Sequence, residues 1–179
     1  MAHHPHYTAT AKWLHWGMAA IWLGAWLLGF SAVHWQAINQ DHLITLTHKA
    51  IASTVLVLVI VRVAWRLTHP APPLPASISP LMQRAAHAGH LLLYAVALIA
   101  LPLSGWAWSS SGNHDVLMLG LIKLPPLVAP NPTVQHLVGV FHTYVAWLCG
   151  AMVGGHALVA LKHHFIDRDG VLSGMLPRR

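Results

Sequence analysis

Charged residues are scarce in this chain of 179 residues, and acidic ones are the scarcest. Four Asp and Glu stand against ten Lys and Arg, so charged side chains make up 8% of the sequence and hydrophobic ones 56%. Soluble domains average about a quarter charged residues. A surface with so little charge cannot face water on all sides. This excludes an ordinary soluble domain and indicates an integral membrane protein in contact with lipid.

Cysteine is almost absent. The single Cys149 excludes an intrachain disulfide, and the sequence contains no Cys-x-x-Cys-His motif that would attach a c-type haem. The formal net charge is +6, and a basic protein can bind nucleic acid. Here, however, the basic residues lie beside apolar spans and not along one exposed stripe, so we expect no nucleic-acid partner.

Four apolar segments are long enough to cross a bilayer, which requires about 20 residues. They are Trp13–Val33, Leu43–Leu67, Leu91–Trp108 and Val138–Leu161. With their polar flanks, the predicted helices cover residues 13–33, 43–67, 87–108 and 138–164. These segments show no alternation with a period of two, and backbone in lipid must form helices or a closed barrel. The sequence therefore predicts an all-α, four-helix membrane bundle formed by one domain, residues 1–179.

Lys and Arg are distributed unequally between the two ends of the predicted bundle. Eight of the ten fall at the end that holds both chain termini: Lys12, Arg62, Arg66, Arg84, Lys162, Arg168, Arg178 and Arg179. The other two, Lys49 and Lys123, fall at the opposite end. Cytoplasmic loops of membrane proteins are enriched in Lys and Arg. We therefore expect a protein of the bacterial inner membrane with both termini in the cytoplasm.

Histidine, in contrast, is abundant, with sixteen residues against four acidic ones. His142 and His156 on the fourth predicted helix are nearly four turns apart, so they share one face at two depths about 21 Å apart. His15 begins the first helix at the cytoplasmic side, and His48 begins the second helix at the outer side. Depth therefore pairs His15 with His156 and His48 with His142. Ionisable residues inside membrane spans are costly and usually functional.

Two imidazoles on different helices at one depth suit a haem group that is ligated by histidine on both faces. The porphyrin fills four positions around the iron, and facing helices supply the two axial nitrogens. The four spans contain no Asp or Glu, which argues against a zinc or di-iron carboxylate site. The sequence thus predicts two b haems, an inner one on His15 and His156 and an outer one on His48 and His142. The alternative is that these histidines are structural residues bonded across the bundle.

Arg62 is a candidate for a second contact with the inner haem. It follows His48 by fourteen residues, so it lies on the same face of its helix at the inner depth. There it could neutralise a haem propionate. An Arg near a helix end can instead extend toward the lipid headgroups, and the sequence does not decide between the two roles.

These motifs, in this order and at these depths, resemble the bacterial cytochrome b561 family over the whole chain. The matching segments are Lys12-Trp13-Leu14-His15-Trp16, Thr47-His48-Lys49, Arg84-x-x-His87-x-x-His90, His142, Gly155-His156, His163-His164 and the terminal Met175-Leu176-Pro177-Arg178-Arg179. The resemblance implies a di-haem b cytochrome whose axial ligands are the four paired histidines. It also implies that ubiquinone binds at the cytoplasmic end. The terminal segment is similar to that of the family's superoxide oxidases.

For ubiquinone we expect contacts from His90 and His163, which match positions that hold quinone in the family. Imidazole can both bond a carbonyl oxygen and supply a proton. His87 could compete with His15 for the haem or with His90 for the quinone. On the outer side, Lys49 could attract superoxide or hold a propionate. The expected enzyme is a superoxide:quinone oxidoreductase in which electrons pass from outer to inner haem.

Two other functions fit the same residues. The chain could be a cytochrome b subunit that connects a partner oxidoreductase with the quinone pool. The outer connections are short for docking a large partner, although the third one leaves room for a small one. Intramembrane histidines also suit a transition-metal transporter, but that function needs a continuous polar path, and closed histidine pairs do not provide one.

Overall fold

The computed structural model describes residues 7–75 and 77–177. Four helical rods within them are long and apolar enough to cross a membrane, as predicted: Ala9–His34, Leu43–Thr68, Pro80–Ser111 and Pro132–Asp167. Arg178 and Arg179, which contribute to the predicted charge asymmetry, lie outside the described residues.

Several of the rods contain more than one helical element. In chain order the elements are α1 (Ala9–His34), the 3-10 turn η1 (Gln36–Ile38), α2 (Leu43–Thr68), α3 (Pro80–Leu93), the π-helix η2 (Tyr94–Ala100), α4 (Leu101–Ser111), β1 (Leu117–Met118), β2 (Ile122–Lys123), α5 (Pro132–Lys162), the π-helix η3 (His163–Asp167) and α6 (Val171–Met175). The third rod is thus α3, η2 and α4, and the fourth is α5 and η3.

The third rod begins earlier and ends later than predicted. At its start, Ser79 Oγ accepts a hydrogen bond from the backbone N–H of Met82 at 3.4 Å. Pro80 fills the first helical position, where its missing N–H costs nothing. At its end, Ser109–Ser111 form the last turn of α4 and are buried, whereas the predicted helix ends at residue 108. Small hydroxyl residues can remain helical there because their side chains bond backbone carbonyls one turn earlier.

The π-helix η2 follows from a proline in the middle of the third rod. Pro102 has no N–H to offer to the carbonyls of the preceding turn. Trp22 of α1 supplies the missing donor, because its Nε1 bonds the carbonyl of Ala97 at 3.0 Å. A second tryptophan of α1, Trp26, donates in the same way to the carbonyl of Ala146 on α5 at 2.9 Å. These two indole groups therefore bond α1 to both the third and the fourth rod.

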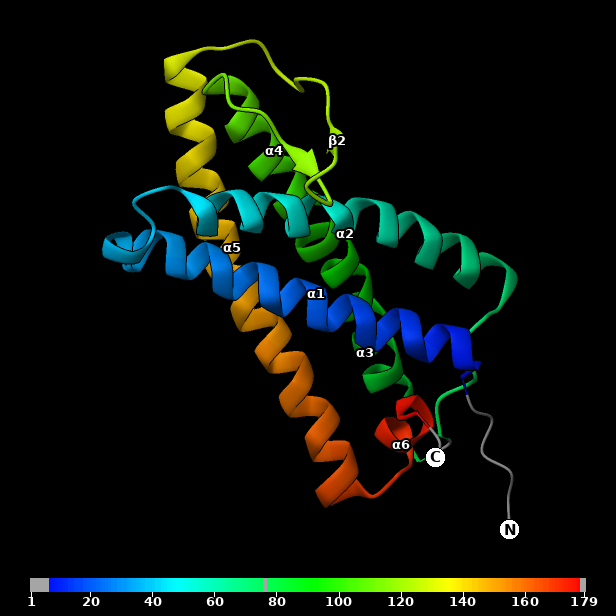
Figure 1. Cartoon of the computed structure of the whole chain (residues 1–179). Helices are drawn as coiled ribbons and strands as arrows, with labels where there is room; N and C mark the ends of the chain where they lie inside the picture. Colours follow the sequence, from blue (N-terminus) through cyan, green and yellow to red (C-terminus); the bar gives the residue numbers. More distant parts are fainter. Residues whose placement is uncertain (1–6, 76, 178–179) are drawn as a thin grey trace.

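The helices pack as two pairs that cross each other. α1 lies along α2, and α4 lies along α5, while the α1–α2 pair passes in front of the other pair in Figure 1. The ends of α5 and α6 lie at the same end of the bundle as the start of α1 and α3 (Figure 1). The described residues nearest the two chain ends therefore lie at the same end of the bundle.

The connection between α4 and α5 departs from a purely helical fold. Its apolar stretch forms a small antiparallel hairpin in which β1 pairs with β2. The turn contains Leu119 and Gly120, both with positive φ (55° and 71°). Leu119 N donates to the carbonyl of Ala50 at 3.2 Å, so the hairpin is docked on α2. No strand is predicted from the sequence, because strands of two residues are too short to show an alternation with a period of two.

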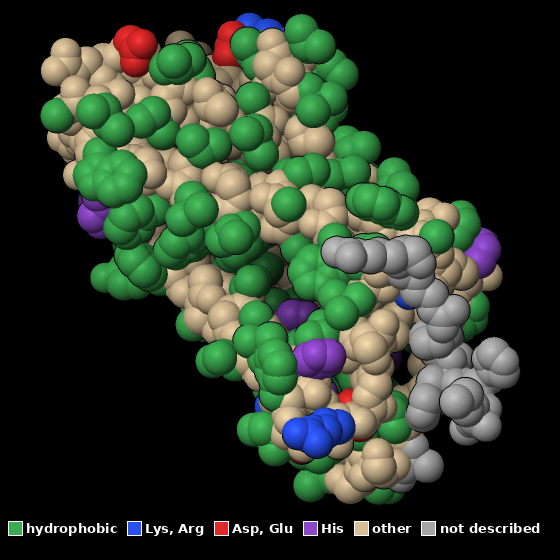
Figure 2. Space-filling view, turned by 60° about the horizontal axis from the view of Figure 1, so that its bottom comes forward, with side chains coloured by type: hydrophobic (Ala, Val, Ile, Leu, Met, Phe, Trp, Pro, Cys, Tyr) green, Lys and Arg blue, Asp and Glu red, His purple; other side chains and the backbone are tan. Residues whose placement is uncertain are grey.

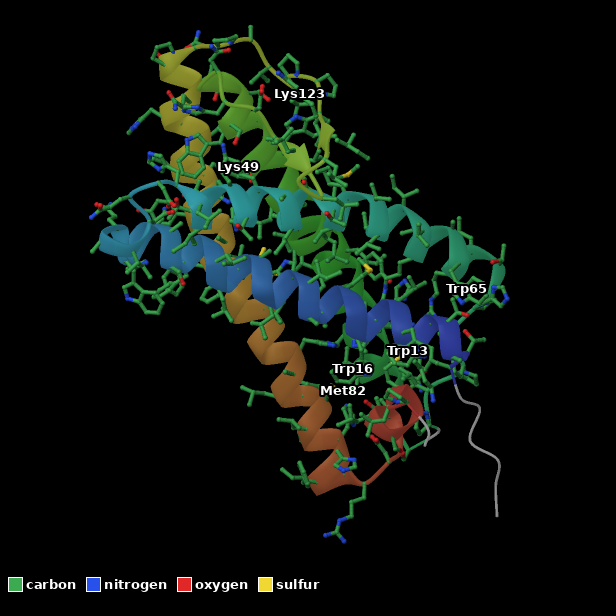
Figure 3. The ribbon with its side chains drawn as sticks, viewed as in Figure 1. Trp13, Trp16, Lys49, Trp65, Met82 and Lys123 are labelled. Atoms are coloured by element: carbon green, nitrogen blue, oxygen red, sulfur yellow. The ribbon has the colours of Figure 1, made fainter. Side chains whose placement is uncertain are left out.

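On the face seen in Figure 2, apolar side chains cover most of the bundle, and the charged ones lie mainly toward its two ends. Trp13, Trp16 and Trp65 gather at the end that holds the termini, whereas Lys49 and Lys123 lie toward the opposite end (Figure 3). This distribution agrees with a membrane protein whose flanks contact lipid and whose ends contact water.

The orientation in the membrane can be tested with single cysteines, because Cys149 is fully buried and contributes little background. Asp115→Cys in the outer connection and Ser173→Cys in α6 are both exposed positions. In intact spheroplasts we expect a membrane-impermeant maleimide to label Asp115→Cys at once and Ser173→Cys only after lysis. The reverse pattern would overturn the predicted cytoplasmic location of the termini.

Candidate functional site

The outer histidine pair lies in an apolar cavity. The ring centres of His48 on α2 and His142 on α5 are 6.3 Å apart. The cavity has a volume of about 260 Å³, and its walls come from all four rods. Side chains of little bulk, such as Ala25, Ala52 and Ala146, line part of it together with aromatic residues. An apolar cavity between helices is suited to a largely apolar ligand.

Hydrogen bonds fix which nitrogen of each outer histidine faces its partner. His48 Nδ1 lies 2.7 Å from the carbonyl of Ala25, and a carbonyl can only accept, so Nδ1 carries the proton. Ser104 Oγ donates to the carbonyl of Leu101 at 2.7 Å and lies 2.9 Å from His142 Nδ1. Because the hydroxyl of Ser104 has one hydrogen, which bonds Leu101, His142 Nδ1 is the donor in the bond between Ser104 and His142. Both rings keep an unprotonated Nε2, which is the form that binds metal.

Two glycines make room for these rings. A Cβ at Gly29 of α1 would lie 2.9 Å from His48 Cε1, and one at Gly105 of α4 would lie 3.0 Å from His142 Cε1. Both distances are shorter than the van der Waals separation of two non-bonded carbon atoms. The helix that faces each histidine therefore has no side chain at the point of contact. This lets the imidazole ring keep its hydrogen-bonded orientation.

The inner histidine pair repeats the geometry of the outer one. The ring centres of His15 on α1 and His156 on α5 are 6.2 Å apart with an angle of 74° between the planes, compared with 6.3 Å and 76° for the outer pair. Metal–imidazole bonds of about 2 Å place two rings that ligate one metal from opposite sides about 6 Å apart, centre to centre. The structure therefore brings together both pairs that the sequence predicts, each at a separation that admits one metal.

Other groups surround the inner pair. His90 of α3 is also close to His156, with ring centres 5.3 Å apart. Arg62 donates from Nη2 to His15 Nδ1 at 3.1 Å and from Nε to the hydroxyl of Tyr94. Arg62 therefore lies at the level of the inner pair, and its guanidinium bonds side chains of the first and third rods.

A layer of packed side chains separates the two pairs. Trp22, Val55 and Cys149 come from three different helices, and each is seven residues, or nearly two turns, from the histidine levels above and below it. Val55 is 2% exposed and Cys149 is 0% exposed. Ala97 and Leu101 of the third rod form one buried cluster with Trp22 and Cys149, and Val55 forms a second with Met18 and Val59. We call this layer the waist, and it places the two sites at separate depths.

The remaining residues predicted for the site make fewer contacts with the histidine pairs. His163 pairs with Asp169, and within the described ranges no hydrogen bond or ring contact joins it to His90. His87 is exposed, and its side chain makes none of the hydrogen bonds found among the described residues. Lys49 is half-buried, and Lys123 forms an ion pair with Asp115 at 2.7 Å, which reduces the positive charge expected on the outer side.

These features define a membrane-spanning helical bundle with two histidine pairs, each spaced as two ligands of one metal would be. Among proteins of this class, a family model described as prokaryotic cytochrome b561 matches residues 6–178. Cytochrome b561 homolog 2 of Escherichia coli K12 is 35% identical over 164 residues, which are 90% of this chain and 86% of that relative. The probable superoxide oxidase CybB of Yersinia pestis is 28% identical over 180 residues, with 98% of each chain covered.

The chain belongs to the prokaryotic cytochrome b561 family and is a multi-pass protein of the bacterial inner membrane. Proteins of this family bind haem b and transfer electrons. The residues of this chain fit that group. Its outer pair offers two unprotonated imidazole nitrogens across an apolar cavity with walls that come from all four rods. The one acidic residue in the four rods is Asp167, the last residue of the fourth.

The sequence analysis missed the residues that support the histidines. Gly29 and Gly105 had no distinguishing signal, because glycines in membrane helices are common and usually mark close helix packing. Ser104 lies four residues before the interfacial Trp108 and has no motif around it. Spacing from His142 would not have found it either, because the two residues lie on different helices.

The role of Gly29 can be tested against a matched glycine on the same helix. In Gly29→Ala the new methyl group would displace the His48 ring, so we expect the protein to fold but lose the outer haem. A Cβ at Gly24 would meet nothing within 4 Å, and Gly24→Ala should keep its full haem content. Both changes raise helix propensity equally. The measurement is the haem-to-protein ratio with the reduced spectrum, and equal ratios in the two variants would contradict the assignment.

Proposed function

We propose that this protein is a superoxide oxidase that carries electrons from superoxide on the periplasmic side to ubiquinone at the cytoplasmic end. The observation that supports it best is the repeated histidine pair, at two depths and with the same geometry. Two such sites in one bundle provide a path for electrons across the membrane. The similarity to a probable superoxide oxidase supports the choice of substrates.

Four histidines would hold the two haems, each haem bound by one residue from α5 and one from α1 or α2. His48 and His142 would ligate the outer haem through Nε2, and His15 and His156 the inner one. Haem b supplies reversible one-electron transfer. The protein's own contribution is to fix the two outer rings by their Nδ1 bonds and to surround the haems with apolar side chains.

Arg62 would have to change partner when the inner haem binds. In the structure it donates to His15 Nδ1, which leaves the ring proton on Nε2 and blocks ligation through that nitrogen. For His15 to bind iron, the guanidinium must release Nδ1. A propionate of the inner haem is the natural acceptor for it, because Arg pairs bidentately with carboxylates.

Quinone would bind where the inner pair opens to the surface. His90 is exposed although its ring lies next to that of His156. Its Nδ1 donates to the carbonyl of Ala86 at 2.7 Å, so Nε2 is the nitrogen left for another partner, and it donates to a quinone oxygen when it carries a second proton. A group that contacts both solvent and the inner site is suited to bind a quinone that arrives from the bilayer.

On the outer side, superoxide would be guided by Lys49 next to His48. Lys123 contributes less, because Asp115 neutralises it. Two superoxide anions would give up one electron each and leave as oxygen, and one ubiquinone would take the two electrons and two protons to become ubiquinol. The alternative, an electron-transfer subunit for a partner oxidoreductase, would need surface for docking, but the hairpin of the longest outer connection is folded onto α2.

The assignment of ligands predicts how haem content responds to single substitutions. Purified protein should contain two haems per chain and be red. We expect His142→Ala to remove the outer haem and His156→Ala to remove the inner one, because each leaves its iron with one axial nitrogen. Redox titration and electron paramagnetic resonance would identify the component that remains. Loss of the same component in both variants would contradict the pairing by depth.

The proposed reaction can be tested with the isolated protein. With superoxide generated enzymatically and a soluble ubiquinone analogue, we expect ubiquinol to form faster than superoxide dismutates spontaneously. Added superoxide dismutase should abolish that formation. If no ubiquinol forms although ubiquinol itself reduces the protein's haems, the proposal is wrong, and an electron-transfer subunit becomes the better description.

A further inference from the structure

The chain reverses direction sharply after α5. The helix passes into η3, and the next residues include Arg168 and Gly170, both in the left-handed region with φ of 52° and 82°. Arg168 has a side chain and adopts this region less readily than glycine. Asp169 lies between these two residues, and the turn directs its side chain back toward the end of the rod that it follows.

The carboxylate of Asp169 is buried and fully partnered. Its side chain is 6% exposed. One oxygen, Oδ1, accepts from the backbone N–H of Val171 at 3.1 Å, and the other, Oδ2, bonds His163 Nδ1. Because a carboxylate only accepts, Nδ1 carries the proton, and His163 Nε2 is the nitrogen left to exchange a proton with another molecule.

The charges around His163 come from its own turn. Asp167 Oδ2 lies 3.3 Å from His163 Nδ1, but Lys162 Nζ bonds both oxygens of Asp167 at 2.8 and 2.6 Å. α6, which packs against η3, contains no titratable side chain. Asp169 is therefore the carboxylate near His163 whose charge no lysine or arginine of the described residues neutralises. It stabilises the positive charge of a doubly protonated imidazole.

This turn lies at the end of the bundle that holds the inner histidine pair. Lys12 Nζ donates to the carbonyl of Leu176 at 2.9 Å, and Trp16 Nε1 donates to that of Met175 at 3.0 Å. α6 is thereby fixed to the start of α1, where Figure 3 shows Trp16 beside it. His163 follows His156 by two turns on the same helix face, about 10 Å farther toward the surface.

We propose that Asp169 is a positioning residue that holds His163 as a proton donor for the quinone reduced at this end. This inference rests on the proposed function. In the step it describes, the Nε2–H bond of His163 breaks and an O–H bond forms on a quinone oxygen. Nδ1–H stays bonded to Asp169, and cytoplasmic water then returns a proton to Nε2. The two electrons come from the two superoxide anions oxidised to oxygen.

The test separates proton delivery from the helix cap that Asp169 also provides. Asp169→Asn keeps an oxygen for Val171 N but removes the charge. Asp41 is the matched control, since its Oδ1 accepts from the N–H of Leu43, also two residues on and at 3.1 Å, and it caps α2 at the outer end. Asp41→Asn thus loses a capping carboxylate without affecting a histidine.

With the haem-loaded, full-length protein, we expect both variants to keep their haem and to take up electrons from superoxide at the wild-type rate when no quinone is present. Ubiquinol formation should fall at least about tenfold in Asp169→Asn and not in Asp41→Asn. The solvent isotope effect on that step should increase. In a His163→Gln background, Asp169→Asn should have no further effect, because the two residues act as one unit.

An independent readout is the hydrogen-bonded Nδ1 proton of His163. Magnetic resonance of protein labelled with nitrogen-15 histidine should show this proton shifted far downfield, and Asp169→Asn should move it upfield. Wild-type turnover with an equally active Asp169→Asn, or an unchanged Nδ1 resonance, would overturn the inference about Asp169 alone. If the wild-type protein forms no ubiquinol from superoxide, it is the proposed function that fails.

Discussion

Two imidazoles can share one metal only if each turns an unprotonated nitrogen toward the other, and this constraint organises the centre of the bundle. At the outer pair, a backbone carbonyl and a serine hydroxyl take the Nδ1 protons, so both Nε2 atoms are available. Gly29 and Gly105 then leave the space that these fixed rings need. The tryptophan hydrogen bonds from α1 to the π-helix and to α5 hold the helices at the spacing on which the pair depends.

The long helices and the histidine pairs could be predicted from sequence because both follow from periodicity. A stretch of about 20 apolar residues has few other stable forms, and residues separated by fourteen positions return to the same helix face. His48 and His142 therefore met as expected from their depth alone. Arg62 was placed at the inner level by the same rule, although the rule could not show that its guanidinium would bond His15.

The features that could not be predicted depend on contacts between segments whose spacing in the sequence follows no regular period. The hairpin rests on a hydrogen bond between Leu119 and Ala50, which are far apart in sequence. Ser104 was found only once α4 lay beside α5. Asp169 reaches His163 through a turn with two left-handed residues, and helical spacing says nothing about such a turn. Supporting residues are thus harder to predict than ligands, since each is defined by a neighbour on another element.

The waist of Trp22, Val55 and Cys149 has a consequence for energy conservation. An apolar layer offers protons no polar path, whereas an electron can cross it between two sites. Under the proposed reaction, negative charge leaves the periplasm and the protons that neutralise it on quinone are drawn from the cytoplasm. Each turnover would therefore make the outside more positive. Detoxification of superoxide by such a protein would add to the membrane voltage rather than dissipate it.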